Sequence, residues 1–333
     1  MSKIKPSKGA PYARIMGVGG YRPTRVVPNE VILETIDSSD EWIRSRSGIA
    51  TRHWASDEET VSAMSVEAAG KAIADAGITP EQVGGVIVST VSHFKQTPAV
   101  ATEIADKIGA VKPAAFDISA GCAGFGYGLT LAKGMVVDGS AEYVLVIGVE
   151  RLSDLTDLED RATAFLFGDG AGAVVVGPSK EPAIGATVWG SEGDKSETIK
   201  QTVPWTDYRA GEVDKFPAIT QEGQAVFRWA VFEMAKVAQQ ALDAAGISAA
   251  DLDVFIPHQA NMRIIDSMVK TLKLPEHVTV ARDVETTGNT SAASIPLAME
   301  RLLATGQAKS GDTALVIGFG AGLVYAATVV TLP

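Results

Sequence analysis

One cysteine, one histidine and one asparagine stand where their side chains could do chemistry. Cys122, the only cysteine in the chain, follows Gly121 and precedes a helix-length run, AGFGYGLTLA. The unpaired N–H groups at a helix N-terminus lower the pKa of a thiol, which favours a cysteine nucleophile. His258 ends a predicted strand in IPHQAN, and Asn289 opens a predicted helix in GNTSAAS. A lone cysteine is more often a small buried side chain, so this interpretation requires that folding bring the three together.

An internal repeat predicts that these three side chains lie close together in the folded protein. AIADAGITPEQVGGVIVST, starting at Ala72, matches ALDAAGISAADLDVFIPHQ, starting at Ala241, at an offset of 169 residues. Further matches follow in the same order, and they pair residues 116–122 with 282–289, 144–148 with 314–318, and 170–175 with 320–325. Cys122 and Asn289 therefore hold equivalent positions. A duplicated chain predicts two halves related by pseudo-twofold symmetry, with the three polar side chains at their interface.

Each copy alternates strand and helix patterns with short connections. This order predicts right-handed crossovers and mostly parallel sheets covered by helices. We divide the chain into an N-terminal half, 1–178, with the nucleophile, and a C-terminal half, 179–333, with the histidine and the asparagine. The segments at about 29–63 and 191–222 have no counterpart and are predicted to be functional or mobile insertions.

The first insertion places an aromatic ring among guanidinium groups. Trp42 lies near Arg44, Arg46 and Arg52 in DSSDEWIRSRSGIATR. Such a cluster suits a nucleotide-like phosphate ligand. A solvated helix with one buried tryptophan fits the composition equally well, so the residues alone leave both interpretations open.

Composition and charge exclude several classes of protein. The 333 residues include 29 Lys and Arg against 40 Asp and Glu, a net charge of −11, which argues against nucleic acid as the main ligand. A single cysteine excludes an internal disulfide and a cysteine-based zinc site, so we expect a cytoplasmic protein without a bound metal. Residues 314–333 carry no charge, but Gly318, Gly320 and Gly322 favour two short strands over a membrane span.

Five motifs together resemble one enzyme family over essentially the whole chain. They are DISAGCAGFGYGL, FGDGAGAVVV, IPHQANMRI, GNTSAASIPLA and GFGAGL, and the family is β-ketoacyl-acyl-carrier-protein synthase III. The resemblance implies an α/β fold of the thiolase type, internally duplicated, with five αβαβα layers and mixed central sheets. It also implies an acyltransferase that joins an acyl-CoA primer to malonyl-acyl-carrier protein with loss of carbon dioxide. The product, β-ketoacyl-acyl-carrier protein, starts fatty acid biosynthesis.

The resemblance assigns catalytic roles to residues of this chain. Cys122 takes the acyl group, and His258 and Asn289 hold the malonyl thioester oxygen as enolate charge develops. The backbone N–H groups of Cys122 and Ala321 form a second oxyanion hole at the acyl carbon. Many relatives have three glycines where this chain has Ala321, which matters little because the donor belongs to the main chain.

Binding roles follow from the same resemblance. It places the adenine of CoA between Trp42 and Arg161, and the CoA site as a whole comprises Trp42, Arg46, Arg161, Gly223 and Asn261. The acyl pocket is lined by Phe167 and, across a homodimer interface, by Thr97. Acidic carrier protein docks on Arg228, Arg263 and Lys270. No cofactor is expected, because acyl-CoA is a substrate, and no nucleic acid or membrane partner is expected.

Other functions remain open from the residues alone. A priming ketosynthase of a secondary-metabolite (polyketide) pathway would share all of these motifs. Elongating ketosynthases and thiolases normally carry a second histidine or cysteine in place of Asn289, and hydroxymethylglutaryl-CoA synthase adds a catalytic glutamate. A cysteine hydrolase or a catalytically silent subunit would differ in the fate of the acyl group. The sequence does not choose between acetyl, straight-chain and branched primers.

Overall fold

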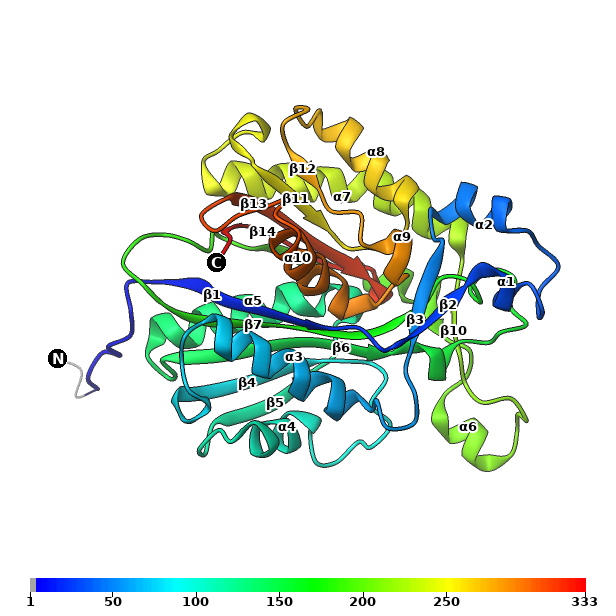
Figure 1. Ribbon diagram of the computed structural model, residues 1–333, viewed down its shortest axis with the longest axis horizontal. Helices are drawn as coiled ribbons and strands as arrows, with labels where there is room; N and C mark the ends of the chain where they lie inside the picture. Colours follow the sequence, from blue (N-terminus) through cyan, green and yellow to red (C-terminus); the bar gives the residue numbers. More distant parts are fainter. Residues whose placement is uncertain (1–3) are drawn as a thin grey trace.

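Two five-stranded sheets form the centre of the molecule, which is described by a computed structural model over residues 4–333 (Figure 1). The first sheet has the order β1 (Tyr12–Tyr21), β7 (Asp169–Ser179), β6 (Tyr143–Arg151), β4 (Val83–Ser89), β5 (Ala114–Ile118). The second has the order β8 (Val188–Ser191), β14 (Val324–Thr331), β13 (Thr313–Gly320), β11 (Val254–Pro257), β12 (Thr279–Val280).

The two sheets have the same construction. In the first, β4 runs parallel to β5 and β6, whereas β7 is antiparallel to both β6 and β1. In the second, β11 runs parallel to β12 and β13, whereas β14 is antiparallel to both β13 and β8. This correspondence confirms the internal repeat, and both sheets are mixed, as the resemblance implied. The predicted division after residue 178 stays a prediction; β7 runs one residue past it, to Ser179.

Helices cover both sheets and fill the space between them. α3 (Val61–Asp75) and α4 (Val100–Ile108) pack on the outer face of the first sheet, and α7 (Gly223–Ala245) and α8 (Met262–Leu272) lie beyond the second. α5 (Gly124–Asp138) and α10 (Ser294–Ala304) lie between the sheets and contact strands of both. The order of layers is therefore αβαβα, as expected.

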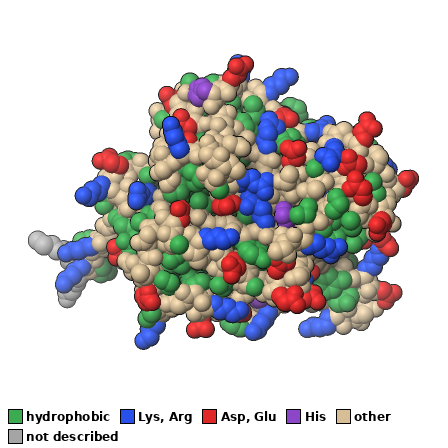
Figure 2. All heavy atoms as spheres, in the orientation of Figure 1, with side chains coloured by type: hydrophobic (Ala, Val, Ile, Leu, Met, Phe, Trp, Pro, Cys, Tyr) green, Lys and Arg blue, Asp and Glu red, His purple; other side chains and the backbone are tan. Residues whose placement is uncertain are grey.

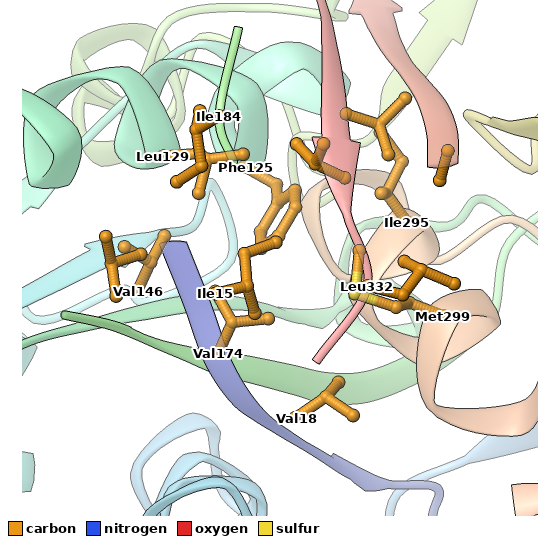
Figure 3. Close-up of a cluster of buried hydrophobic side chains, with 14 of the residues drawn as sticks. Ile15, Val18, Phe125, Leu129, Val146, Val174, Ile184, Ile295, Met299 and Leu332 are labelled. Carbon is orange, nitrogen blue, oxygen red and sulfur yellow. The ribbon is translucent and has the colours of Figure 1, made fainter. Parts of the chain in front are cut away.

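The layer between the sheets is the central core (Figure 3). Phe125 and Leu129 of α5 and Ile295 of α10 are buried there against Val146 and Val174 of the first sheet. Because α5 has a sheet on each side, its sequence is apolar and small around much of its circumference and not only on one face. The core joins the halves and fixes the positions of the helix N-termini between the sheets.

The segments without a repeat counterpart form short local structures. The first contains α1 (Asn29–Ile32), α2 (Asp40–Ser47) and β3 (Thr51–Trp54), which pairs with β2 (Arg25–Pro28) just before the segment. The second contains β9 (Ile199–Gln201) paired with β10 (Ile219–Gln221), with α6 (Trp205–Ala210) between them.

Short helices complete the chain. They are η1 (Pro80–Gln82), η2 (Gly121–Ala123), η3 (Leu152–Leu155), η4 (Gly193–Thr198), η5 (Ala249–Asp251), α9 (Val284–Thr287), η6 (Ser291–Ala293) and η7 (Ala321–Leu323).

The apolar C-terminal segment forms two strands. β13 and β14 pair in antiparallel fashion and are joined by the η7 turn at the glycines that interrupt the run. The strand interpretation of this segment is confirmed. Over residues 4–333, no helix combines the length and the apolar character needed to cross a membrane.

Two equivalent glycines let the halves approach each other closely. Gly148 lies on β6, and a Cβ atom there would lie 2.1 Å from the carbonyl oxygen of Ala292 in η6. Gly318 lies at the matching place on β13, and a Cβ atom there would lie 2.9 Å from the carbonyl oxygen of Cys122. A strand of each half therefore packs directly on the turn that carries a polar site residue in the other half.

Replacing Gly148 with alanine should destabilise the protein. The added methyl group must displace backbone, and overpacking of this kind costs about 1–3 kcal/mol or more. We expect a lower melting temperature or loss of folded protein, measured by calorimetry. The control is Gly134→Ala in α5, where nothing lies within 4 Å of the added carbon; it should raise stability by up to about 1 kcal/mol. Equal melting temperatures for the two variants would contradict this account.

Candidate active site

One cavity brings the three predicted site residues together. Cys122 lies in η2, between β5 and α5; His258 directly follows β11; and Asn289 lies between α9 and η6. All three line a cavity of about 200 Å³ whose walls are mainly apolar. The repeat predicts this meeting, because each residue stands at the end of a strand or the start of a helix at the contact between the halves.

Burial dominates the protonation of Cys122. It raises the pKa of the thiol to about 12; a hydrogen bond with the Ser291 side chain lowers the pKa, and the nearby charge of Glu150 raises it. This desolvation opposes the thiolate that the helix N-terminus is predicted to stabilise. The thiolate at Cys122 stays a prediction.

His258 is a neutral hydrogen-bonding group. Its side chain is almost fully buried, and burial lowers the pKa of the imidazole to about 3. Nδ1 lies 2.7 Å from the Ser294 hydroxyl oxygen, which also accepts a hydrogen bond from the Gln259 backbone N–H at 3.4 Å. The Ser294 proton can then be donated to Nδ1, which leaves the ring proton on Nε2. The ring of Phe319 packs edge-on against the imidazole, with 5.3 Å between ring centres.

Asn289 is held by both its backbone and its side chain. Its backbone N–H donates to the Leu166 carbonyl at 2.9 Å, and its own carbonyl accepts from Gly168 at 3.0 Å, so the second half is tied to the first. The side-chain Oδ1 accepts the Ser291 backbone N–H at 2.9 Å. This fixes the amide orientation and leaves the Nδ2 hydrogens, which bond to no other described residue, available to a ligand.

The turn with Ala321 lies beside Cys122. A Cβ atom at Gly320 would lie 2.9 Å from the Cys122 backbone nitrogen and 2.9 Å from its Sγ atom, so only glycine fits this approach. Ala321 follows in η7 and lines the same cavity. The two backbone groups predicted to form an oxyanion hole are therefore on the same wall of the cavity.

The two predicted acyl-pocket residues are in different places. Phe167 is buried and lines the cavity together with Leu152, Leu155, Ile199 and Ile219. Thr97 lies in the exposed segment before α4, joined to Pro98 by a cis peptide bond, and it does not line the cavity of its own chain.

A larger cavity of about 690 Å³ adjoins the first. The two share lining residues, among them Val226, Ala260 and Asn289, so together they form a continuous path to the thiol. Six of the residues predicted to bind CoA or carrier protein line this cavity. They are Trp42, Arg46, Gly223, Asn261, Arg228 and Arg263.

Trp42 is the centre of an aromatic and cationic group. The Arg161 guanidinium carbon lies 5.0 Å from the centre of the Trp42 ring, and that of Arg46 lies 5.8 Å from it. Phe165 packs edge-on from below, with 5.5 Å between ring centres. An adenine ring can enter between Trp42 and Arg161 only when Arg161 moves aside, which its exposed position permits.

Other polar residues near Trp42 serve the fold. Arg52 is completely buried and donates to the Val27 and Phe165 carbonyls, at 3.2 and 3.1 Å, so it does not reach a ligand. Arg44 pairs with Asp40 on the same helix. Of the three arginines in the sequence cluster, Arg46 is therefore the one that lines the cavity.

Asn261 has both amide atoms engaged. Its Oδ1 caps α8 by accepting the Arg263 N–H at 2.8 Å, and its Nδ2 donates to the Arg46 carbonyl at 3.0 Å. These bonds tie α2 to α8 at the edge of the cavity that Asn261 lines, and its contact with CoA stays a prediction.

Basic side chains stand at the mouth of this path. Arg228 of α7 and Arg263 of α8 are exposed, and the Arg263 guanidinium lies 4.9 Å from the centre of the Phe227 ring. Lys270 is seven residues further along α8, about 10.5 Å along the helix axis. Figure 2 shows acidic and basic side chains scattered over one face of the molecule.

Four side chains around the site were not singled out from the sequence. They are Ser291, Ser294, Phe319 and Glu150. The two serines belong to the GNTSAAS motif, so their spacing from Asn289 is a usable signal. Glu150 follows the apolar strand VLVIGV, and a charge that ends such a strand is the signal for it. In the described part of the chain, no group of three or more His, Cys, Asp or Glu side chains could hold a metal ion.

The comparisons with known proteins agree with this geometry. Family models for 3-oxoacyl-[acyl-carrier-protein] synthase III match residues 116–193, and for its C-terminal part residues 242–332. The β-ketoacyl-[acyl-carrier-protein] synthase III of Streptomyces glaucescens is 90% identical over 333 residues, all of both chains.

Solved structures show the same arrangement. The priming β-ketosynthase of the R1128 polyketide pathway superposes with a TM-score of 0.97 at 44% identity, over 100% of this chain and 99% of that one. The 3-oxoacyl-(acyl carrier protein) synthase III of Pseudomonas aeruginosa PAO1 gives a TM-score of 0.89 at 36% identity, over 97% and 98%.

The duplicated αβαβα fold, with a cysteine, a histidine and an asparagine on one buried cavity, defines a condensing enzyme of the thiolase fold. More narrowly, the chain belongs to the β-ketoacyl-[acyl-carrier-protein] synthase III family of acyltransferases.

The His258 ring should stay neutral throughout the physiological range. Because its pKa is lowered to about 3, lowering the pH from 8 to 5 should leave its ring signals unchanged in ¹⁵N NMR, with the proton on Nε2. The resonance is assigned by its loss in His258→Ala. A titration midpoint between pH 5 and 8, or a proton on Nδ1, would contradict the assignment of His258 as a neutral Nε2–H donor.

Proposed function

We propose that this protein condenses an acyl-CoA primer with malonyl-acyl-carrier protein, with loss of carbon dioxide, to give the β-ketoacyl-acyl-carrier protein that starts fatty acid synthesis. The observation that supports this most is the shared cavity of Cys122, His258 and Asn289, reached by a path with Trp42 and Arg46 on its wall. Such a path suits a long thioester arm with a nucleotide at its far end. Because acyl-CoA is then a substrate, the proposal needs no resident cofactor.

The first half-reaction transfers the acyl group. The Cys122 sulfur attacks the thioester carbonyl, the carbonyl oxygen gains negative charge, and the CoA sulfur leaves with its electron pair. Backbone N–H groups of Cys122 and Ala321 would stabilise that oxygen, and fixed main-chain donors need no reorganisation at the moment of reaction. Phe167 and the apolar wall around it would enclose the acyl chain.

The second half-reaction removes carbon dioxide from the malonyl group. The electron pair of the breaking C–C bond moves onto the thioester oxygen, which becomes an enolate before the carbon attacks the acyl-cysteine. The Nε2–H of a neutral His258 and the Nδ2–H of Asn289 are the donors that would stabilise this oxygen. Both are oriented by other contacts, from Ser294 and Ser291, so their positions are set before substrate enters.

The partners of the proposal follow from charge and exposure. Arg228, Arg263 and Lys270 would receive an acidic carrier protein despite the net charge of −11, because a local basic patch is sufficient to steer association. Thr97, which stands outside the cavity of its own chain, would contact the pocket of a second copy in a homodimer. A cytoplasmic location, where CoA thioesters and a free thiol persist, is part of the same proposal.

A second candidate function uses the same chemistry in a different pathway. The superposition on a priming β-ketosynthase of a polyketide pathway, at a TM-score of 0.97, favours a priming role in secondary metabolism. The two functions differ in primer and in carrier protein. Initial rates with a panel of acyl-CoA primers, each paired with carrier proteins of both kinds, separate them.

Replacing His258 or Asn289 with alanine should separate the half-reactions. Both variants should still take one acyl group on Cys122, seen as an added mass, because no enolate forms in that step. Decarboxylation of malonyl-carrier protein should fall by about 100-fold or more, since one oxyanion donor stabilises by about 2.7–4 kcal/mol. Cys122→Ala should take no acyl mass. Release of free acid by the wild-type protein would favour a hydrolase, and equal loss of both steps would contradict the assignment of roles.

Replacing Trp42 with alanine should weaken the binding of acyl-CoA and leave the binding of malonyl-carrier protein unchanged. Base–aromatic stacking stabilises by about 1–3 kcal/mol, so the KM for acyl-CoA should rise about 10-fold while the KM for malonyl-carrier protein changes little. Trp205→Ala is the matched control, because Trp205 is an exposed tryptophan on α6 that lines neither cavity. An unchanged KM for acyl-CoA in Trp42→Ala would show that Trp42 does not bind CoA.

A further inference from the structure

Gln259, the residue that follows His258, has a buried side chain whose amide bonds to the backbone at both of its polar atoms. Its Nε2 donates to the Pro257 carbonyl at 2.7 Å and to the Ala281 carbonyl at 3.3 Å. Its Oε1 accepts the Val284 backbone N–H at 3.1 Å. Because two carbonyls face one amide atom and an N–H faces the other, only one orientation of the amide satisfies all three contacts.

The contact with Pro257 leads to His258. Pro257 is the last residue of β11 and directly precedes the histidine. The Gln259 backbone N–H donates to the Ser294 hydroxyl at 3.4 Å, the same hydroxyl that bonds to Nδ1 of the imidazole. The backbone N–H of His258 itself donates to the Ile317 carbonyl at 2.7 Å. Gln259 is therefore bonded to groups on either side of the histidine.

The contact with Val284 leads to Asn289. Val284 is the first residue of α9, and the first N–H groups of a helix have no acceptor within the helix. Gln259 supplies that acceptor. The Val284 carbonyl in turn accepts the Gly288 backbone N–H at 3.1 Å, and Gly288 directly precedes Asn289. One helical turn therefore connects the Gln259 amide to the backbone of Asn289.

We propose that Gln259 is a positioning residue that sets the spacing between His258 and Asn289, the two donors to the enolate oxygen. This inference rests on the proposed function and adds to it the group that holds the two donors at one distance. Gln259 is not among the described residues that line the two cavities, so it acts through its neighbours and does not touch the substrate. Both donors stabilise the enolate only when each lies at hydrogen-bond distance from its oxygen.

A second set of contacts should keep α9 folded when the Gln259 amide is lost. The Oδ1 atom of the buried Asp283 carboxylate lies 2.7 Å from Nη1 of Arg301 and 3.3 Å from Nη2 of Arg22. Arg301 also donates to the Thr286 hydroxyl at 2.6 Å. These bonds hold the helix from α10 and from the first half of the chain. Loss of the amide is therefore expected to shift α9 and not to unfold it.

The test is Gln259→Met, which keeps the length of the side chain and removes its three hydrogen bonds. In protein already acylated on Cys122, decarboxylation of malonyl-carrier protein should fall at least about 10-fold, because a displacement of about 1 Å can cost about 100-fold. The fall should be in kcat with KM little changed, since the enolate charge develops only in the transition state. Acyl transfer from acyl-CoA in a single turnover should stay within about threefold of the wild-type rate, because no enolate forms in that step.

A double substitution separates positioning from general damage to the fold. In Asn289→Ala the spacing no longer matters, and His258 keeps its own contacts with Ile317 and Ser294. Adding Gln259→Met to Asn289→Ala should therefore slow decarboxylation by less than about threefold further, since the effects of residues that act as a unit do not add. A further fall as large as that in the single variant would contradict action through Asn289.

A conservative variant and a control for lost stability complete the comparison. In Gln259→Glu a neutral carboxyl, the form that burial favours, still accepts the Val284 N–H and donates one hydrogen bond, so decarboxylation should be faster than in Gln259→Met. Ile104 is completely buried in α4 and is not among the described residues that line either cavity. Ile104→Ala should lower the melting temperature and decarboxylate at the wild-type rate.

Hydrogen exchange in the wild-type protein tests the contact without any substitution. The Val284 amide proton should exchange at least about 100-fold more slowly than in an unfolded peptide, because the Gln259 oxygen is its acceptor. This measurement serves even if Gln259→Met fails to fold. Exchange at the rate of an unfolded peptide would show that the contact is absent and would overturn the proposal.

The outcomes separate this inference from the proposed function. Slow decarboxylation in Gln259→Met with normal acylation, partly restored in Gln259→Glu and absent from the control, supports the positioning role. Decarboxylation at the wild-type rate by a folded Gln259→Met, or equal loss of both half-reactions, overturns that role and leaves the condensing function standing. Failure of the wild-type protein to decarboxylate malonyl-carrier protein overturns the proposed function and the inference with it.

Discussion

The close contact between the two halves is the constraint on which the site depends. Gly148 and Gly318 are equivalent positions of the repeat, and the backbone of a turn from the other half packs directly against each of them. Those turns carry Cys122 and the Asn289–Ser291 segment, so the distance between nucleophile and amide is fixed by main-chain packing and not by flexible side chains. Catalytic geometry needs positions held within a fraction of an ångström, and backbone contacts of this kind supply that.

Burial then sets the chemistry of the groups that the contact brings together. The same exclusion of water raises the pKa of the Cys122 thiol, lowers that of His258 and raises that of Glu150 towards neutrality. A neutral imidazole is a hydrogen-bond donor, whereas a protonated one would add a charge to a dry cavity at a high cost. The apolar lining, which excludes water, is therefore also the cause of the shifted pKa values in the site.

Much of this could be predicted from the sequence, and the remainder shows where such prediction ends. The repeat fixes the order of strands, and polar residues at strand ends identify Cys122, His258 and Asn289, because periodicity and position are local signals. Arg46 and Arg52 have the same type and lie six residues apart, yet one lines a cavity and the other is buried beneath it. That difference depends on packing between distant segments, as does the use of Ser294 to orient His258.

The stacking of Arg161 on Trp42 has a consequence for turnover. At the proposed CoA site, an arriving nucleotide would replace the Arg161–Trp42 contact with its own contacts to the two side chains, so the net affinity would be the difference between two similar energies. In the proposed reaction, the CoA product and the incoming pantetheine arm of the carrier protein would compete for the same path to Cys122. Because Arg161 competes with the nucleotide for Trp42, it would favour dissociation of CoA and so leave the path open for the pantetheine arm.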